Sequence, residues 1–356
     1  MTVTLTFDST LSRVRVDATG LNDALTALVE RSTNQVTWST VRGGVDVPVT
    51  AGVISTVDDY EFAADVTNYY RVTYTQVMSF VAAGAAAHAN NASVSPGLPA
   101  GLTQGDQMVM LAAIRNSGTG TPDTPAGWTL LVTAANMRVF GKTAGASESA
   151  PTVTFTGGVA NADTSAQIAA FRGVDLTPVT VPATQLNGST QDIAVPAATL
   201  STTLNGGLNL WTGWKQDDWT SVDVVSGGTE IGEPDTTTGD DQGIVWDYRI
   251  LAKTTPFSSL SARTFTVTGG AAAISRSSTT VFQHALTNQT NSITPSLAGV
   301  AWIKVIARPF LNTAVEVFDT INVTRKARQG VFDVVGRSLP VAVTDVRGPR
   351  EFDLRV

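Results

Sequence analysis

A short series of motifs occurs twice in the middle of this chain, in the same order and at nearly the same spacing. The offsets agree, since 249 − 138 = 111, 267 − 155 = 112 and 282 − 171 = 111. A duplicated strand pattern of this kind predicts two similar antiparallel halves packed face to face, as in a jelly roll. The first copy comprises Arg138–Lys142, Phe155–Gly158 and Gln167–Phe171, and the second comprises Arg249–Lys253, Val267–Gly270 and Thr279–Phe282.

Composition favours an all-β fold of several domains. The 356 residues are 42% hydrophobic and only 15% charged, and Thr, Val, Ala and Gly are abundant. β-branched residues fit a pleated surface and glycine supplies turns. The chain has no cysteine, which excludes disulfides and thiolate metal sites, and its net charge of −7 disfavours a nucleic-acid partner. The longest apolar run, Phe80–Ala87, is too short to span a membrane.

Residues 1–76 are expected to form a separate β-sandwich. Apolar residues alternate with polar ones from Val3 to Phe7, as in a half-buried strand. This region resembles a fibronectin type III-like module, in which Val36–Trp38 would be the strand with the core tryptophan. Tyr69–Tyr74 would be the strand that carries the tyrosine corner.

Residues 77–311 are expected to form the jelly-roll-like β-sandwich, with repeat halves at about 105–175 and 205–285. Gln107–Ile114 is a continuous apolar run, which predicts a buried strand. The Gly157-Gly158 and Gly269-Gly270 pairs fit hairpin turns.

Residues 312–356 form a distinct basic segment of strand-like pieces. Its last 36 residues hold seven basic and four acidic side chains, a local charge of +3 that leaves −10 for the rest. The segment could dock onto an acidic neighbour or simply be a solvated surface. Phe352–Val356 still alternates, so we expect it to pair with a neighbouring subunit or to continue into further chain. The candidate docking residues are Arg325, Lys326, Arg328, Arg337, Arg347 and Arg350.

Several of these segments resemble known families. Pro125–Leu131, Arg138–Lys142, Pro151–Phe155 and Ala169–Asp175 look like a domain that is common in bacteriophage tail proteins. Thr324–Arg337, followed by Pro340–Arg347, is similar to minor tail proteins of long-tailed phages that infect actinobacteria.

The resemblance implies a structural component of a virion tail tip or tail fibre that serves host attachment. Such a protein is assembled in the host cytoplasm, and the absence of a signal peptide at Met1 and of cysteine fits that expectation. Its partners would be other tail proteins and further copies of itself, as a trimer or hexamer. A bacterial surface adhesin could share these folds, but it should carry an export signal.

A carbohydrate site is the main alternative function. Trp214 and Trp219 lie in the polar segment Gly213–Thr220, where exposed indole rings could stack on a host glycan while Asp217 and Asp218 accept hydroxyl hydrogen bonds. A tryptophan in such a loop can equally cover its own core, as we expect for Trp211 in its apolar strand.

Catalytic chemistry has weaker support. Asp218 and Asp241 could serve as paired carboxylates of a glycosidase, a remote third hypothesis. His88 and His284 are the two histidines, and no Gly-x-Ser-x-Gly elbow accompanies them. Asp235, Asp240 and Asp241 could bind calcium, but their spacing does not fit an EF-hand. We therefore predict no catalytic residues, no metal site and no cofactor.

Overall fold

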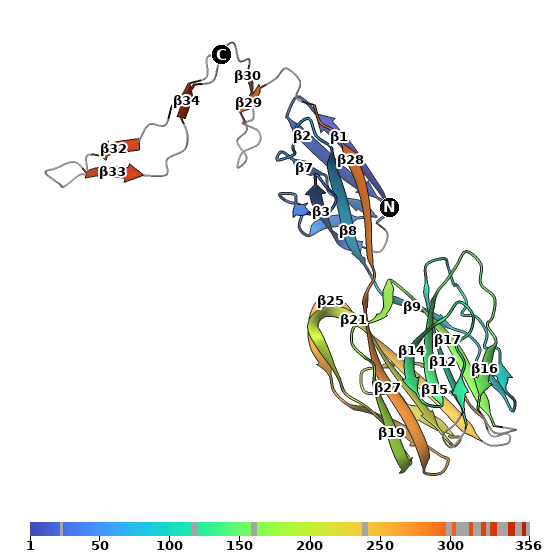
Figure 1. Cartoon of the computed structure of the whole chain (residues 1–356). Helices are drawn as coiled ribbons and strands as arrows, with labels where there is room; N and C mark the ends of the chain where they lie inside the picture. Colours follow the sequence, from blue (N-terminus) through green and yellow to red (C-terminus); the bar gives the residue numbers. More distant parts are fainter. Residues whose placement is uncertain are drawn as a thin grey trace. The chain divides into compact units, whose positions relative to one another are not determined.

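Every regular element that the structure describes is a β-strand, and the strands pair in antiparallel sheets (Figure 1). The computed structural model describes residues 1–296 except 22–23, 116–119, 158–161 and 237–240. Beyond residue 296 it describes the backbone of six short strands. The predicted all-β class is confirmed. Within these residues no helix is long and apolar enough to cross a membrane.

The chain forms two compact units, and the second is inserted into the sequence of the first. The N-terminal unit comprises Met1–Gly20, Ala27–Val72 and Gln289–Val356, and the duplicated unit comprises Leu21–Thr26 and Thr73–Asn288. Strand β8 (Asn68–Gln76) leads from one unit to the other, and β28 (Leu286–Ile293) returns and pairs with β8. The N-terminal sheet therefore takes a strand from the range 77–311 that the sequence analysis gave to the central domain.

The N-terminal unit is built around one nine-stranded sheet. Its strands show the burial alternation predicted from the sequence, and in β2 (Arg13–Thr19) the side chains of Val14, Val16 and Ala18 are fully buried. The sheet order is β1-β2-β6-β5-β3-β8-β28, with β4 on β3 and β7 on β2. Besides β2, β8 and β28, the sheet contains β1 (Thr2–Asp8), β3 (Ala24–Ser32), β4 (Ser39–Thr40), β5 (Val47–Thr50), β6 (Val53–Ile54) and β7 (Val57–Asp59).

The predicted core tryptophan strand is wrong. Val36–Trp38 forms a bend in which Val36 is 83% exposed. Trp38 instead lies near the surface under the guanidinium of Arg71, whose Cζ is 4.3 Å from the ring centroid. The tyrosine strand is present as β8, and the Tyr70 hydroxyl donates to Asp59 Oδ2 at 2.7 Å. Polar turn residues around Val36 bind one another and prevent the segment from entering the core.

The duplicated unit contains the same strand topology twice. Each half has a large sheet and a three-stranded sheet, ordered β10-β17-β12-β15-β14 and β11-β16-β13 in the first half, with β9 on β17. In the second half the orders are β19-β27-β21-β25-β23 and β20-β26-β22, with β18 also on β27 and β24 on β25.

Nine strands of the described residues make up the first half of the duplicated unit. They are β9 (Ser79–Ala83), β10 (Ala87–Ala89), β11 (Ser93–Val94), β12 (Gln107–Ile114), β13 (Thr121–Pro122), β14 (Thr129–Ala134), β15 (Met137–Thr143), β16 (Val153–Thr156) and β17 (Thr164–Arg172). The second contains β18 (Val174–Pro178), β19 (Ala183–Thr190), β20 (Ile193–Val195), β21 (Ala198–Lys215), β22 (Ser221–Asp223), β23 (Thr229–Gly232), β24 (Asp235–Thr236), β25 (Gln242–Leu260), β26 (Arg263–Thr268) and β27 (Ala273–His284).

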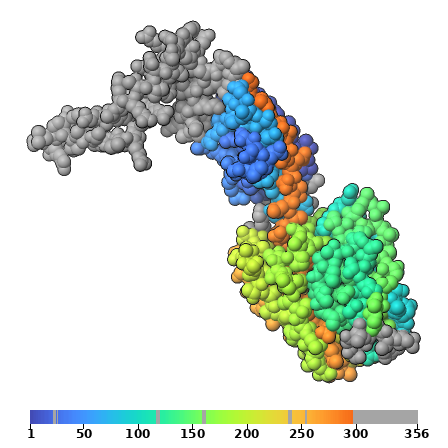
Figure 2. All heavy atoms as spheres, viewed as in Figure 1, coloured from blue at the N-terminus to red at the C-terminus, as the bar shows by residue number. Residues whose placement is uncertain are grey.

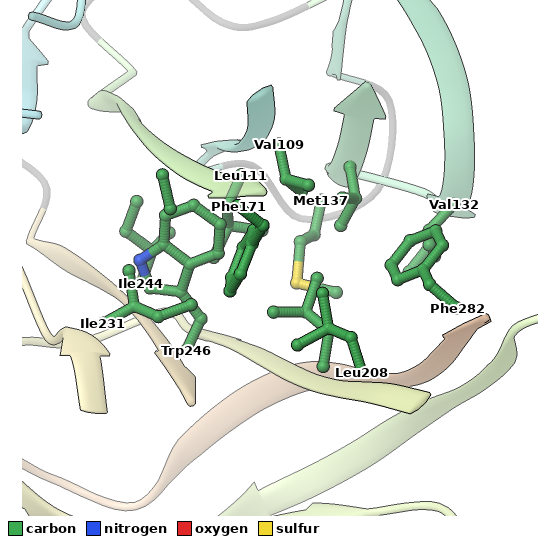
Figure 3. Packing of buried hydrophobic residues seen from close by; sticks show 14 of the residues in the cluster. Val109, Leu111, Val132, Met137, Phe171, Leu208, Ile231, Ile244, Trp246 and Phe282 are labelled. Carbon is green, nitrogen blue, oxygen red and sulfur yellow. The ribbon is translucent and has the colours of Figure 1, made fainter. Parts of the chain in front are cut away.

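Three layers of apolar side chains hold this unit together. Each half has its own core between its large and small sheets, centred on Phe140 in the first half and Phe265 in the second. A third core joins the two large sheets, where Leu111 and Phe171 of the first half meet Leu208 and Trp246 of the second (Figure 3). The space-filling view shows the halves in close contact (Figure 2). The duplicated unit is thus a pair of sandwiches, and its central strands are buried on both faces, which explains the continuous apolar run at Gln107–Ile114.

After residue 296 the described residues form six short strands, paired in three two-stranded sheets. They are β29 (Ala301–Ile303) with β30 (Thr313–Val315), β31 (Asn322–Thr324) with β34 (Glu351–Asp353), and β32 (Arg328–Phe332) with β33 (Val341–Asp345). Of the candidate docking residues, Arg328 is described only as backbone in β32. The other five, Arg325, Lys326, Arg337, Arg347 and Arg350, lie outside the described residues.

Candidate functional site

Trp214 is a core residue. It lies in β21, is 1% exposed, and belongs to the core between the two large sheets. Its Nε1 donates to Gln242 Oε1 at 2.7 Å, which satisfies the only polar atom of the ring. The prediction that Trp214 is exposed in a polar turn is wrong, because β21 continues to Lys215.

Trp219 covers the core of the second half. It is 6% exposed, and its Nε1 donates to the carbonyl of Glu233 at 3.0 Å. The ring lies against the backbone of Gly243, where an added Cβ would be 2.2 Å from Trp219 Cη2. The exposed position predicted for Trp219 is therefore also wrong, and neither indole face is available to stack on a sugar. The alternative in which the loop tryptophan covers its own core is confirmed.

Asp217, Asp218 and Asp241 come together at the edge of this core. Carboxylate oxygens of the three lie within 4.8 Å of one another. Burial, and then the charges of Asp217, Asp241 and Asp235, raise the pKa of Asp218. Asp217 accepts a hydrogen bond from Ala271 N, and its Oδ2 is 4.0 Å from the fully buried Lys215 Nζ.

This acidic cluster has cations of its own. Lys215 lies beside Asp217, and an Arg115 Nη1–Asp241 Oδ1 distance of 3.9 Å adds a second positive charge. These contacts place the cluster between Lys215 of the second half and Arg115 of the first half. Of the residues suggested for calcium, Asp240 lies outside the described residues.

The histidines make local structural contacts. His88 Nδ1 is 2.8 Å from Ser165 Oγ, a pairing that the sequence analysis did not anticipate. Ser165 is fully buried and also accepts from Gln242 Nε2 at 2.9 Å, so no substrate can reach its hydroxyl. His284 Nδ1 lies 2.8 Å from the carbonyl of Gln76, next to the return of the chain into β28.

Asp247 is the most strongly perturbed carboxyl in the duplicated unit. It is fully buried in β25 opposite Trp211, which is buried as predicted. Burial raises the pKa of Asp247 to about 7 although its Oδ2 accepts from Val225 N at 2.6 Å. The charges of Glu230 and Glu233 raise the pKa further. This carboxyl is enclosed by protein, so it bears on stability and pH response.

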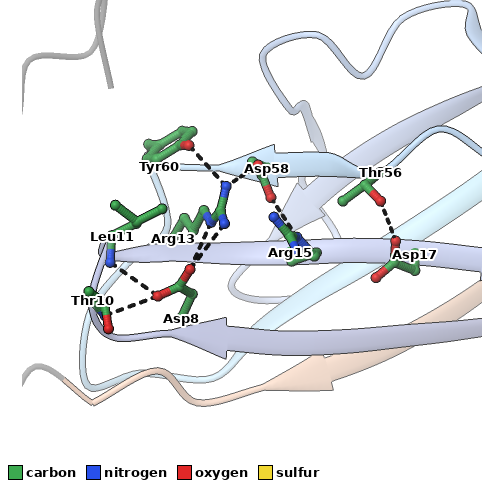
Figure 4. Close-up of polar contacts among 9 residues, drawn as sticks. All are labelled: Asp8, Thr10, Leu11, Arg13, Arg15, Asp17, Thr56, Asp58 and Tyr60. Carbon is green, nitrogen blue, oxygen red and sulfur yellow. Dashed lines mark hydrogen bonds and ion pairs between the residues drawn. The ribbon is translucent and has the colours of Figure 1, made fainter. Parts of the chain in front are cut away.

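The N-terminal unit has an ion-pair network that joins its first hairpin to β7 (Figure 4). Arg13 contacts Asp58 at 2.5 Å and Asp8 at 3.1 Å, and Arg15 Nε donates to Asp58 Oδ1 at 3.2 Å. Asp8 also accepts from the backbone amides of the β1–β2 turn. Each of the two carboxylates, Asp8 and Asp58, accepts a hydrogen bond from a guanidinium, so the network has a structural role in holding β7 against the first hairpin.

A groove of about 530 Å³ lies in the duplicated unit, and sequence reasoning missed it. We call this hollow the junction groove. Strands β14 and β15 of the first half form one side, and β18 of the second half forms the other. Its residues are far apart in the sequence and only the packing of the halves brings them together. The lining used below comprises Gln107, Thr129, Leu131, Lys142, Asp175 and Leu176.

The junction groove presents both donors and acceptors. Lys142 Nζ donates to Glu148 Oε2 at 2.6 Å, which leaves further N–H groups on the ammonium. Asp175 Oδ1 accepts from Thr177 N at 2.9 Å, its Oδ2 accepts from Gln283 Nε2 at 3.1 Å, and the Thr177 hydroxyl donates to the same carboxylate. Each oxygen retains acceptor capacity toward a ligand.

Comparisons with known proteins identify no relative. The sequence matches no protein-family model, no curated protein sequence and no solved structure.

Proposed function

We propose that this chain is a structural component of a bacteriophage tail tip or tail fibre, and that it displays β-sandwich domains for attachment to the host surface. The observation that carries the proposal is that the described residues form antiparallel sheets, packed as a pair of sandwiches in the duplicated unit, whose candidate chemical groups are used internally. Trp214, Trp219 and Asp217 all bind other parts of the fold. Such a molecule suits display and binding.

The resemblance to tail proteins supplies the biological setting. It rests on Pro125–Leu131 and its companion segments, and on Thr324–Arg337 near the end of the chain. In this proposal the role is non-enzymatic and the location is the virion tail tip. The basic residues after 312 dock onto other tail proteins or onto further copies of the chain, which form a trimer or hexamer.

Light scattering of the purified chain, with and without residues 312–356, tests the assembly part of the proposal. A trimer or hexamer that becomes a monomer on truncation is the expected result, because the basic segment would hold the copies together. A monomeric full-length chain would contradict it, and so would a truncated chain that keeps the oligomeric state of the full-length chain.

Adsorption of the fluorescently labelled full chain to actinobacterial cells tests the attachment part. We expect saturable adsorption without release of reducing sugar from the cell wall polymer. Release of reducing sugar would instead favour the glycosidase hypothesis, with Asp218→Asn and Asp241→Asn as the first variants.

A further inference from the structure

The duplication creates two structurally equivalent positions, one in each half. In the first half Gly141 pairs with Thr129 on one side and Val109 on the other. In the second half Tyr248 pairs with Thr229 and Leu210 in the same way. A glycine therefore occupies the rung of the first half that a tyrosine occupies in the second.

The tyrosine fills its position with an aromatic stack. Its ring lies on Phe80 of β9, with centroids 4.8 Å apart and planes at 20°, and meets the edge of Phe171 at 5.5 Å. Strand β9 belongs to the opposite half, so this stack closes the gap between the halves on one side of the unit. The contact involves the same kinds of strands as the junction groove, with the halves exchanged.

Gly141 has no side chain to fill the corresponding position. The tips of Leu131 and Leu176 occupy it instead, and their Cδ1 atoms lie 2.8 and 2.9 Å from where a Cβ would be. The junction groove of about 530 Å³ lies here, within the roughly 300–1,000 Å³ of sites for small molecules. One junction is thus plugged by a side chain, and its counterpart is a hollow.

The lining of the junction groove selects a class of ligand. Lys142 and Asp175 are its one cation and one anion, and Glu148 already neutralises the lysine, so an anionic ligand such as a phosphate gains no net attraction. The lining residues, all within the described part of the chain, include no aromatic ring on which a nucleobase could stack. Leucine side chains supply apolar lining next to polar groups that both donate and accept.

We propose that the junction groove binds a short neutral saccharide. Hydroxyl groups of the sugar would exchange hydrogen bonds with Asp175, Gln107 and Lys142, while a C–H face of the ring lies on Leu131 and Leu176. The proposal rests on the proposed function, because it names the ligand through which the displayed sandwich contacts a host glycan. It also replaces the predicted tryptophan site by a different one.

Saturation-transfer NMR of the full chain with neutral sugars tests the proposal. The probes are glucose, galactose, rhamnose and N-acetylglucosamine and their disaccharides, with glucose 6-phosphate as the anionic comparison. Saturable binding of at least one neutral sugar, and weaker binding of the phosphate, is expected. Absence of binding of every neutral probe would overturn the proposal.

Two variants locate the binding. Gly141→Tyr introduces at this position the side chain that Tyr248 provides at the equivalent one, and it requires the flexible tips of Leu131 and Leu176 to move aside. Thr129→Trp fills the junction groove from an exposed position on β14. Thr133→Trp is the matched control, since Thr133 is exposed on the same strand but does not line the groove. We expect affinity to fall by about tenfold or more in the first two variants and to stay unchanged in the third. If Thr129→Trp folds and binds sugar as the wild type does, the junction groove is not the site.

Cell adsorption separates this proposal from the proposed function. If the wild type adsorbs to cells and Thr129→Trp adsorbs equally well, the attachment role stands and the junction groove is overturned as its sugar site. If the wild type does not adsorb, attachment fails, and the NMR measurement still decides whether the groove binds a neutral sugar.

Discussion

Asp247 couples the stability of the second half to pH. Burial raises its pKa from 3.8 to about 7, so between these values the folded chain holds a proton that the unfolded chain has lost. The free energy of unfolding should therefore fall as pH rises from about 4 to about 7, and stay level above that. The shift corresponds to at most about 4 kcal/mol at 1.36 kcal/mol per pKa unit.

Asp247→Asn is the variant that tests this coupling, because the amide keeps the shape but cannot lose a proton. Urea unfolding between pH 4 and pH 8 should show a smaller fall in stability for the variant than for the wild type, and the variant should be the more stable at pH 8. Burial also raises the pKa of Glu233 and Asp218, so part of the slope should remain in Asp247→Asn. Equal slopes in the two proteins would show that Asp247 is ionised in the fold.

Lys215 is a buried ammonium that costs the fold stability. Burial lowers its pKa despite the attraction of Asp217, Asp192 and Asp218, so desolvation outweighs the charges around it. Lys215→Met should raise the free energy of unfolding by about 1 kcal/mol or more. Lys142→Met is the opposite case, because Lys142 donates to the nearly buried Glu148 at 2.6 Å and its loss strands that carboxylate. Thermal melting should give opposite signs for the two variants, and a lower melting temperature for Lys215→Met would contradict the argument.

At the level of single residues, the sequence indicated burial well where an apolar run surrounded a side chain, and poorly where polar residues did. Trp211 was predicted to be buried because its strand is apolar. Trp214 and Trp219 were predicted to be exposed because aspartates lie between them, yet their partners Gln242 and Glu233 come from a segment about 14 to 28 residues further along. The pairing of β21 with β25 brings Gln242 to Trp214, and Glu233 directly follows β23, which pairs with β25 in turn. No local sequence pattern encodes these pairings.

The element that closes the second half depends on one glycine. Trp219 lies directly on Gly243 of β25, and a methyl group there would meet the rigid ring at 2.2 Å. Gly243→Ala should therefore displace the indole and lower the free energy of unfolding by about 1–3 kcal/mol, as overpacked cores do. Gly188→Ala in β19 is the control, since nothing lies within 4 Å of its added methyl. Acrylamide quenching should increase for Gly243→Ala only, and unchanged quenching together with unchanged stability would show that the tryptophan does not occupy this position.

The repeat that predicted the duplicated strands is not in register throughout. Phe171 and Phe282, which are 111 residues apart, pair with Gln107 and Leu208. On their other side, Gln107 pairs with Thr143 and Leu208 pairs with Ile250, and 250 − 143 = 107. The Arg138–Lys142 and Arg249–Lys253 motifs, aligned at 111, are therefore displaced by four residues in the sheets. An even displacement keeps every side chain on the same face, which is why the sequence pattern survives it.

For the whole molecule, composition and alternation predicted the all-β class, and the repeated motifs predicted the duplication. Both features leave a pattern that can be recognised directly in the sequence. The strand order of the N-terminal sheet was not predictable in the same way. Strand β28 pairs with β8 across more than 200 intervening residues, and its mixed sequence Leu286–Ile293 carries no signal of that partner. The junction groove was missed for the same reason, since it exists only where two halves meet.

The insertion of the duplicated unit makes a prediction about folding. Gln76 N donates to the carbonyl of Ala285 at 3.1 Å, and Ala285 N donates to Gly173 O at 2.8 Å, so the two points at which the chain enters and leaves the insert are adjacent. Adjacent ends allow an insert to be removed without stretching the host, and each unit has a core of its own. Residues 77–285 alone, and residues 1–76 joined to 286–356 by an Asn-Gly turn, should each fold. Calorimetry should give one cooperative transition for each piece, together accounting for the transitions of the full chain. If either soluble piece lacked a cooperative transition, that unit would depend on the other for its fold. The inserted unit and its host would then not be independent folding units.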